Sequence, residues 1–206
     1  MSTTAEIGTL PLLEQAGREA LFTEARTAST FTDQPVTDAE LREIWDLARW
    51  SPSASNGQPL RVLFVRTDEG RERLLAHVAD GNKAKVSAAP VTAVLAFDPD
   101  FHEHFATTFP ARAEMMRDRF AADADARAQN ATYNAALQTG VLLLAVRAAG
   151  LAAGPMAGFD KAGVDAEFFG GSGWRSHLLL NIGHPGADAW FPRLPRLDES
   201  TVLDWA

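Results

Sequence analysis

Apolar side chains recur at helical spacing in several stretches of the chain. The clearest stretch follows the capping box Thr37-Asp38-Ala39-Glu40, and its apolar face holds Leu41, Ile44, Trp45 and Ala48. The same periodicity predicts four more helices, over residues 10–25, 71–78, 130–149 and 160–169. Gly150 follows the longest of them, at the position where a glycine commonly ends a helix.

Short apolar runs with a β-branched bias predict four strands, over residues 62–65, 91–97, 151–153 and 177–183. The run Val91–Phe97 contains no charged residue, and such a strand is buried on both faces and lies inside its sheet. The chain shows no internal repeat and no stretch with the composition of a linker. The pattern therefore predicts one α+β domain over residues 1–206.

Residues 98–127 interrupt this pattern. The segment is charged and aromatic, and it carries Met115, Met116 and Phe120 at helical spacing. We interpret it as an excursion from the core and as a candidate lid over a binding site.

The predicted helix over residues 130–149 is apolar on nearly all sides and rich in alanine. A helix of this kind is buried on most of its faces. In a chain of 206 residues a subunit interface would supply the second buried face. The sequence therefore predicts a homodimer packed through this helix.

The connection Trp50–Pro59 places hydroxyl and amide side chains between a helix and a strand. Pro52 stops the helix, and Pro59 predicts an extended conformation for Gln58. Uncharged donors and acceptors suit a ligand with ring nitrogens and carbonyls, or a polyol chain. The same residue types are also ordinary in a solvated turn.

Charge and composition exclude several classes of function. The formal net charge of −8, with no basic stripe, argues against a nucleic-acid partner. The absence of Cys excludes disulfides, thiolate metal sites and thiol nucleophiles, and it fits a cytoplasmic protein. Residues 1–6 lack the features of a signal peptide, and no apolar run is long enough to span a bilayer.

Three further polar segments are candidates for ligand binding. Arg26 precedes several hydroxyl residues, a combination that suits a phosphate, although an arginine after a helix is also favourable on a surface. A polar, basic segment holds Asn82, Lys83 and Lys85, and the tail carries Arg193 and Arg196.

In this order and setting, these segments resemble the FMN-dependent nitroreductase family. The specific motifs are Pro52–Pro59 and Gly154-Pro155-Met156-Ala157-Gly158-Phe159-Asp160, and the resemblance covers nearly the whole chain. Within the family, the chain is most similar to the malonic semialdehyde reductases of pyrimidine degradation. Three segments carry this finer similarity, namely Leu21–Thr27, Phe101–His104 and Gly154–Asp160.

The resemblance implies a nitroreductase-like fold, with a central mixed or antiparallel sheet flanked by helices. It implies an intertwined homodimer with two FMN sites at the interface and NAD(P)H as electron donor in ping-pong order. In the branch named above, the acceptor would be 3-oxopropanoate. No side chain is assigned as catalytic, since water or a ribityl hydroxyl can supply the proton.

The resemblance also implies FMN-binding residues. The phosphate and ribityl end would contact Arg26, Thr27 and Ser29, with the clamp completed by Arg193 and Arg196. Pro155 and Met156 would pack on one ring face, and the backbone of Ala157 and Gly158 would approach N5. Asn82 and Lys85 would lie at the pyrimidine edge, and the partner subunit's loop would supply Ser53, Ser55, Asn56 and Gln58.

A cation near N1 would stabilise the reduced ring, with Lys85 the first candidate and Lys83 the second. A carboxylate on the acceptor would be bound by Arg112, Arg119 or His104. The chain departs from the family pattern at Ser29 and Thr30, where a second basic residue is frequent, and at Ala157, where Glu is frequent.

Three alternative functions stay open. A reductase of this fold could act broadly on nitroaromatics and quinones. The fold could also bind or process a flavin without this catalysis. From a different class, a metal-dependent hydrolase could use Asp98, Asp100, His102 and His104, because closely spaced His and Asp side chains are common metal ligands.

Overall fold

The computed structural model describes residues 10–206, and the segment that argues against a signal peptide lies outside this range. Four strands form one sheet, in the order β1-β2-β4-β3. Their bounds are β1 Leu60–Val65, β2 Val91–Phe97, β3 Ala152–Met156 and β4 Arg175–Gly183. Every neighbouring pair is antiparallel, so the sheet is antiparallel rather than mixed.

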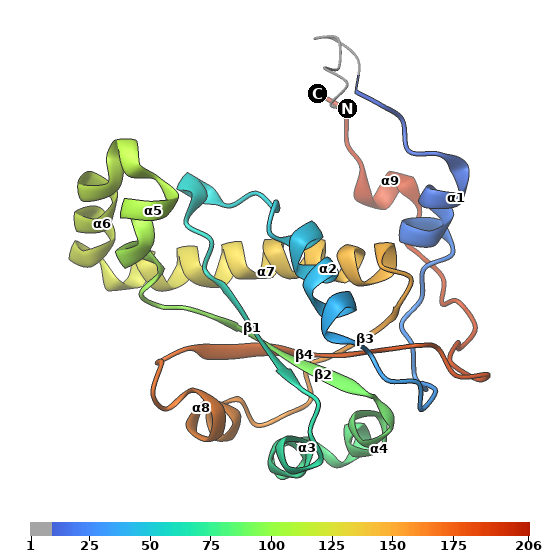
Figure 1. Cartoon of the computed structure of the whole chain (residues 1–206). Coiled ribbons are helices and arrows are strands. Elements are labelled where there is room, and N and C mark those ends of the chain that lie inside the picture. Colours follow the sequence, from blue (N-terminus) through green and yellow to red (C-terminus); the bar gives the residue numbers. More distant parts are fainter. Residues whose placement is uncertain (1–9) are drawn as a thin grey trace.

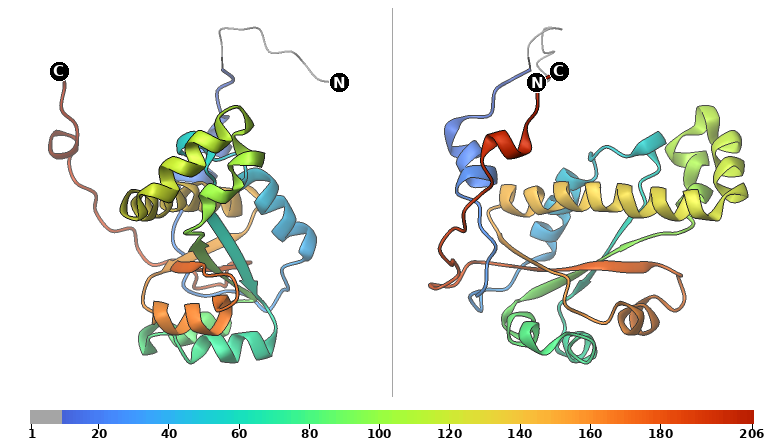
Figure 2. Two further views of the ribbon diagram at one scale, coloured as in Figure 1. Left: turned by 90° about the vertical axis from the view of Figure 1, so that its left-hand side faces the viewer. Right: turned by 180° about the vertical axis from the view of Figure 1, so that it is seen from behind.

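Helices cover both faces of the sheet (Figures 1 and 2). One face carries α2 (Asp38–Ala48) and the long α7 (Ala124–Ala148). The other face carries α3 (Asp68–Leu75), α4 (Asp80–Ala88) and α8 (Lys161–Phe169). The expected α+β architecture, with an antiparallel sheet flanked by helices, is confirmed.

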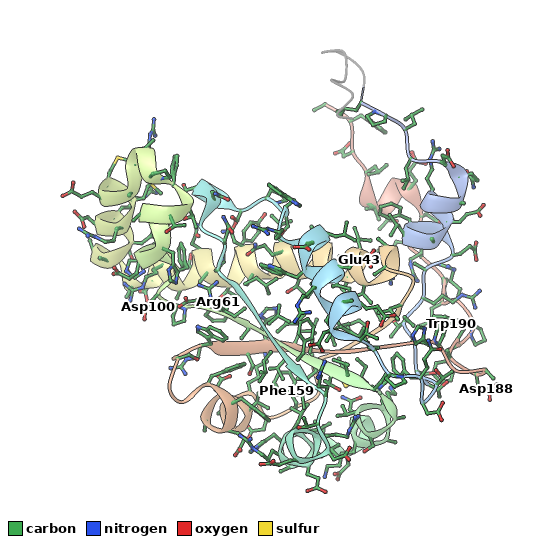
Figure 3. All side chains as sticks on the ribbon, viewed as in Figure 1. Glu43, Arg61, Asp100, Phe159, Asp188 and Trp190 are labelled. Carbon is green, nitrogen blue, oxygen red and sulfur yellow. The ribbon has the colours of Figure 1, made fainter. Side chains whose placement is uncertain are left out.

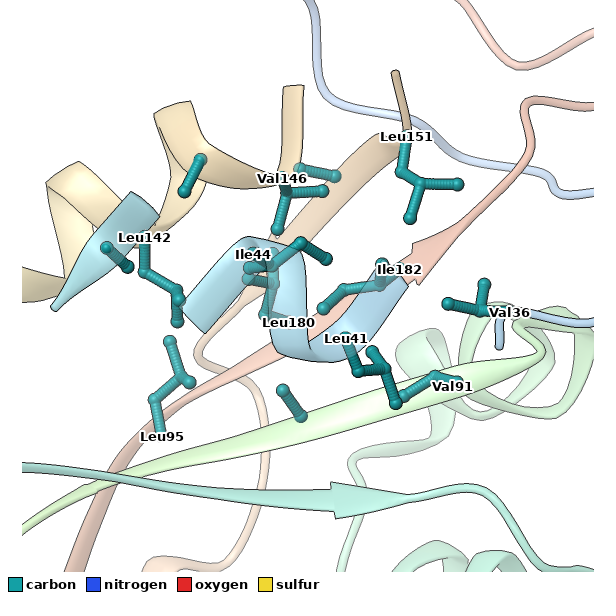
Figure 4. Packing of buried hydrophobic residues seen from close by; sticks show 14 of the residues in the cluster. Val36, Leu41, Ile44, Val91, Leu95, Leu142, Val146, Leu151, Leu180 and Ile182 are labelled. Carbon is teal, nitrogen blue, oxygen red and sulfur yellow. The ribbon is translucent and has the colours of Figure 1, made fainter. Parts of the chain in front are cut away.

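The inner strand β2 contributes to both cores because its side chains alternate between the two faces. Val91, Ala93 and Leu95 pack with α2 and α7, in the cluster that Figure 4 shows. Val94 and Ala96 pack with α3, α4 and α8. The prediction of an interior strand buried on both sides is therefore confirmed.

The capping box of α2 is present as predicted. The hydroxyl of Thr37 accepts from the amide of Glu40, and the carboxylate of Glu40 accepts from the amide of Thr37. The amide and the hydroxyl of Thr37 both donate to the carboxylate of Glu40 and lower its pKa, with a further contribution from the nearby His184. Gly150 adopts a φ of 77° just after α7, as a helix-ending glycine does.

Two predicted segments differ from the structure. The stretch 10–25 forms only α1 (Gln15–Arg18) and a π-helical turn, Glu19–Thr23, and neither buries a residue. Asn82, Lys83 and Lys85, described from the sequence only as a polar, basic segment, lie in the helix α4 (Asp80–Ala88). Apolar periodicity did not predict this helix, because Val86 is the one residue that α4 buries.

The excursion, residues 98–127, builds a small core of its own. It contains three short helices, a 3₁₀ turn at Phe101–His104, α5 (Phe105–Thr108) and a 3₁₀ turn at Pro110–Arg112, followed by α6 (Ala113–Ala122). Phe101, Phe105, Met116 and Phe120 are buried against Ala131 of α7. The segment is thus packed on the first half of α7, whose first turn begins earlier than predicted.

The remaining short elements are a 3₁₀ turn at Ala54–Asn56 and α9 (Glu199–Val202) in the tail. In Figure 1, α9 lies towards the end of α7 that is opposite to α5 and α6. Within residues 10–206, no helix combines the length and the apolar character needed to cross a membrane.

Candidate functional site

A cavity of about 250 Å³ lies between β3, α4, the segment 25–29 and the carboxyl-terminal tail. We call it the cationic cavity. It brings together eight of the residues predicted to bind FMN, namely Arg26, Thr27, Ser29, Lys85, Pro155, Met156, Arg193 and Arg196. These residues come from four separate stretches of sequence, and the tertiary fold alone makes them neighbours.

Backbone hydrogen bonds hold the segment 25–29 against the wall of this cavity. The amide of Ala28 donates to Ala153 O of β3 at 3.0 Å, and the amide of Ser29 donates to Ala189 O of the tail at 3.0 Å. The close approach to β3 requires a glycine, because a Cβ at Gly154 would lie 2.7 Å from Ala28 O. The segment is therefore fixed on both sides by the main chain.

The cavity is strongly positive. Four of its lining residues are cations, Arg26, Lys85, Arg193 and Arg196, and none of the described lining residues is Asp or Glu. Arg193 Nη2 donates to Thr23 O at 2.5 Å, which holds the tail against the opposite rim. Cations with no acidic neighbour, alongside two hydroxyls, form a donor set suited to a phosphate.

The structure separates the two lysine candidates. Lys83 Nζ lies 2.7 Å from Asp80 Oδ1 on the same helix and lowers the pKa of that carboxyl. Lys85 lines the cavity instead. The backbone of α4 is anchored there by Asn181, whose Nδ2 donates to Lys85 O at 2.9 Å and whose Oδ1 accepts from Thr92.

Asn82, Ala157 and Gly158 lie beside the cavity rather than in its lining. Asn82 Nδ2 donates to Gly158 O at 3.2 Å, which ties α4 to the turn after β3. Ala157, which directly precedes Gly158, is exposed. The structure therefore brings these three residues next to the lining of the cavity, and it adds the contact that joins Asn82 to Gly158.

The predicted loop residues Ser53, Ser55, Asn56 and Gln58 lie elsewhere on the same chain. They contact the excursion and the first half of α7, where Asn134 Oδ1 accepts from the amide of Ala54 at 2.7 Å. In Figure 3, Arg61 and Asp100 mark this end of the sheet, and Asp188 and Trp190 mark the other. One chain does not bring this loop to its own cationic cavity.

The expected extended conformation of Gln58 is wrong. Its φ is 46°, and Ser55 and Asn56 each have a φ of 53°, so three residues other than glycine occupy the left-handed region. Local hydrogen bonds override the preference imposed by Pro59. Ser53 Oγ accepts from the amide of Gln58 at 3.1 Å, and Arg61 Nη1 donates to Gln58 O at 2.9 Å.

The residues of the hydrolase alternative do not form a metal site. Asp98 Oδ2 accepts from Arg61 at 2.6 Å, and His104 Nε2 lies 3.3 Å from the same oxygen. His102 is buried against the ring of Phe101. Within residues 10–206, no group of three or more His, Asp or Glu side chains is arranged to hold a metal ion.

Sequence reasoning missed Phe191 and Gly154, which also line the cavity. The position of Phe191, directly before Pro192-Arg193, was the available signal that it lines the same cavity as Arg193. It also missed Asn181 and Arg61, whose contacts join strands to segments far away in the chain. No local pattern marks such residues.

The model of the nitroreductase family matches residues 23–184. A protein of Streptomyces coelicolor named "Putative NADH dehydrogenase/NAD(P)H nitroreductase" is 54% identical over 199 residues, covering 97% of this chain and 98% of its own. A protein of the same name from Leptothrix cholodnii is 46% identical, covering 92% and 96% respectively.

Solved structures share the fold. A nitroreductase family protein from Streptococcus pneumoniae superimposes with a TM-score of 0.80 at 24% identity, covering 90% of this chain and 98% of its own. A protein from Exiguobacterium sibiricum, described as a "putative nitroreductase in complex with FMN", has a TM-score of 0.79 at 23% identity, covering 91% and 96%.

Proposed function

This chain belongs to the nitroreductase family, and on that premise we propose that it is an FMN-dependent oxidoreductase that takes electrons from NADH or NADPH. The observation that carries the proposal is the cationic cavity, whose described lining residues include four cations and no carboxylate. A phosphorylated ligand fits this donor set, whereas an uncharged ligand would leave the cations without a counter-charge.

The residues of the cavity suit FMN. Arg26, Arg193 and Arg196 would hold its phosphate. Ser29 Oγ donates to Ala189 O at 3.0 Å, so its lone pairs remain able to accept from a ribityl hydroxyl. Pro155 and Met156 would pack on one face of the ring, which is flat and apolar.

FMN supplies the hydride chemistry when it is bound, and the protein supplies binding, orientation and electrostatics. Lys85 would stabilise the negative charge that reduction places on the ring, since Lys85 lines the cavity and Lys83 is paired with Asp80. The chain's remaining contribution is to hold the ring with one face open to the donor and then to the acceptor.

We propose that the site is completed by a second copy of this chain. The cavity of about 250 Å³ lies below the roughly 300–1,000 Å³ range of most small-molecule sites. The Ser53–Gln58 loop is folded and polar, and it lies far from its own cavity. A partner packed on α7 would bring that loop to the cavity of the first copy.

The surface of α7 supports this assembly. Tyr133 and Leu137 are 72% and 43% exposed, and a Cβ at Gly140 would meet nothing within 4 Å. These positions lie three to four residues apart, so they form one apolar stripe on the face of α7 turned away from the sheet. The exposed, extended tail, residues 190–206, would then intertwine with the partner.

Leu137→Arg tests the dimer, because it places a charge within the proposed interface. We expect light scattering after gel filtration to give a dimer for the wild type and a monomer for this variant, with loss of bound FMN. Ala128→Arg is the control, since Ala128 is exposed on the same helix about two and a half turns before Leu137 and therefore points in the opposite direction. A wild-type monomer that retains FMN would refute the shared site.

For the acceptor, we propose 3-oxopropanoate. The similarity to malonic semialdehyde reductases in the three segments named above supports it, as do two exposed arginines of the excursion. Within residues 10–206, neither Arg112 nor Arg119 lies within ion-pair distance of a carboxylate, whereas His104 already faces Asp98. A carboxylate on the substrate would give either arginine a partner.

Two measurements test the function. The purified protein should be yellow or should bind added FMN, and Arg26→Gln and Lys85→Gln should each weaken that binding.

Anaerobic oxidation of NADH and NADPH should then be followed with 3-oxopropanoate, a nitroaromatic and a quinone. Turnover on the nitroaromatic or quinone alone would select the broad reductase. FMN binding without NAD(P)H oxidation would indicate a flavin-binding protein.

A further inference from the structure

The Ser53–Gln58 loop holds a backbone conformation that its own residues disfavour. Ser55, Asn56 and Gln58 all have φ between 46° and 53°. Left-handed residues other than glycine cost on the order of 1–3 kcal/mol each and persist only where the surroundings hold them. The conformation therefore depends on contacts from outside the loop.

Contacts at the start of the loop are short and come from two directions. Asn134 Oδ1 of α7 accepts from the amide of Ala54 at 2.7 Å, and Asn56 Nδ2 donates to Thr108 O of α5 at 2.6 Å. The loop is also closed on itself, since Gln58 Nε2 donates to Asn56 Oδ1 at 2.9 Å.

At the end of the loop, Ser53 Oγ accepts from the amide of Gln58, and Arg61 holds the carbonyl of the same residue. Arg61 Nη1 donates to Gln58 O and to Leu60 O, both at 2.9 Å. Its guanidinium also lies over the ring of Trp174, 5.7 Å from the centroid. Arg61 thus holds the carbonyl of a left-handed residue directly before Pro59, where the chain enters β1.

Asp98 fixes the orientation of Arg61. Its Oδ2 accepts from Arg61 Nη2 at 2.6 Å, while its Oδ1 accepts from the amide of Asp100 at 2.8 Å. The amide of Asp98 donates to Pro59 O at 2.9 Å. The side chain of Asp98 is only 9% exposed and that of Arg61 20%, so water competes little with this pair.

We propose that Arg61 and Asp98 are positioning residues that hold Gln58 O and thereby keep the Ser53–Gln58 loop in its ligand-ready conformation. Neither side chain lines the cationic cavity, and the inference rests on the proposed role of this loop in FMN binding. Their loss weakens FMN binding without removing any group that touches the ligand, because the loop must then be ordered at the moment of binding.

Arg61→Lys and Asp98→Asn test this role. A lysine can still pair with Asp98, but its single ammonium cannot reproduce the fork that reaches two carbonyls and a carboxylate. Asparagine keeps an acceptor for the amide of Asp100 and removes the charge that orients Arg61. We expect each variant to bind FMN at least tenfold more weakly in a fluorescence titration of FMN-free protein.

The chain offers a matched control pair. Arg73 Nε donates to Glu167 Oε1 at 2.6 Å, and the Arg73 guanidinium lies 5.0 Å from the centroid of Phe168. This arrangement repeats that of Arg61, Asp98 and Trp174, but it joins α3 to α8. We expect Arg73→Lys and Glu167→Gln to change FMN affinity less than twofold, whatever their effect on the melting temperature.

The same substitution made in a Gln58→Gly protein separates a positioning role of Arg61 from a general structural role. Glycine adopts the left-handed region without strain, so Gln58→Gly removes the need for support at that carbonyl. We expect Arg61→Lys to weaken FMN binding less than threefold further in the Gln58→Gly protein. A full tenfold loss in that background would overturn the positioning role, as would an equal loss in the Glu167→Gln control.

Hydrogen exchange of the ligand-free protein gives a readout that does not depend on FMN. The amides of residues 53–58 should exchange at least tenfold faster in Arg61→Lys than in the wild type, with no change in Arg73→Lys. Unchanged exchange would refute the inference. A wild type that does not bind FMN would instead refute the proposed function. If Arg61→Lys and Asp98→Asn bind FMN as tightly as the wild type does, the positioning role is refuted and the proposed function is not.

Discussion

Asn82 and Gly158 are 76 residues apart, and the space between them admits no side chain. Asn82 Nδ2 donates to Gly158 O at 3.2 Å, and the same nitrogen would lie 2.5 Å from a Cβ at position 158. The glycine therefore serves close approach, since its φ is not in the left-handed region. This contact joins α4 to the turn after β3, next to the cationic cavity.

Gly158→Ala is expected to weaken FMN binding by about five- to tenfold and to destabilise the fold by about 1 kcal/mol. The new methyl group displaces the amide of Asn82 and breaks its hydrogen bond. Titration with FMN and urea unfolding measure the two effects. Gly81→Ala is the control. Gly81 lies next to Asn82 on α4, and a Cβ at Gly81 would meet no atom within 4 Å. It should leave affinity unchanged.

Gly154→Ala should be more damaging. Its Cβ would lie 2.7 Å from Ala28 O, a backbone atom that cannot move aside alone. The segment 25–29 must separate from β3, which strains or breaks the hydrogen bond from the Ala28 amide to Ala153 O. We expect a loss of about 2–3 kcal/mol in urea unfolding. Gly171→Ala, which meets no atom within 4 Å, should cost far less, and equal losses would contradict the steric explanation.

His177 should make stability depend on pH. It is the extra residue of a β-bulge, since Leu95 pairs with Leu178 and Ala96 with Ser176. Burial, with a smaller effect of the nearby Lys161, lowers its pKa from 6.5 to about 4. As the pH falls, the His177 ring is therefore protonated in the unfolded chain before it is protonated in the folded protein. The stability contributed by the neutral ring is complete above pH 6.5 and is lost as the pH falls towards 4.

The loss attributable to His177 between pH 7.5 and pH 4.5 should be about 1–2 kcal/mol, allowing for partial exposure of the ring. Urea unfolding at both pH values measures it. Other groups titrate in the same range, so the informative quantity is the difference between wild type and His177→Gln. Glutamine can keep a hydrogen bond to Thr139 Oγ1, which lies 2.9 Å from His177 Nε2. Identical pH profiles would contradict the assignment.

Gln138→Met should destabilise the fold by about 1–3 kcal/mol, because it leaves a buried donor without a partner. Gln138 is 2% exposed, and its Oε1 accepts from the amide of Leu60 at 3.0 Å. Methionine fills a similar volume, so the lost hydrogen bond dominates the change. Thermal or urea unfolding measures it. Gln34→Met, at an exposed position, should stay within about 0.5 kcal/mol of the wild type.

Local patterns predicted the elements whose signals lie within a few residues. The capping box of Thr37 and Glu40, the interior strand Val91–Phe97 and the glycine after α7 follow from sequence spacing alone. The helix α4 was not predicted, because a helix that buries only Val86 shows no apolar stripe. The sequence predicted an extended conformation for Gln58, because residues before a proline favour it. That local preference does not account for the hydrogen bond that Gln58 O accepts from Arg61.

The sequence by itself determined the four strands, the helices α2, α3, α7 and α8, and the burial of β2. The resemblance to the nitroreductase family supplied eight of the residues that line the cationic cavity. Periodicity and short motifs are properties of neighbouring residues, so they can be read along the chain. Only the tertiary structure decided that Lys85 rather than Lys83 faces the cavity, and that Asn82 meets Gly158. It alone showed that Arg61, paired with Asp98, donates to Gln58 O. Those outcomes depend on hydrogen bonds and close approaches between segments tens of residues apart, which form only when the sheet and its helices have packed.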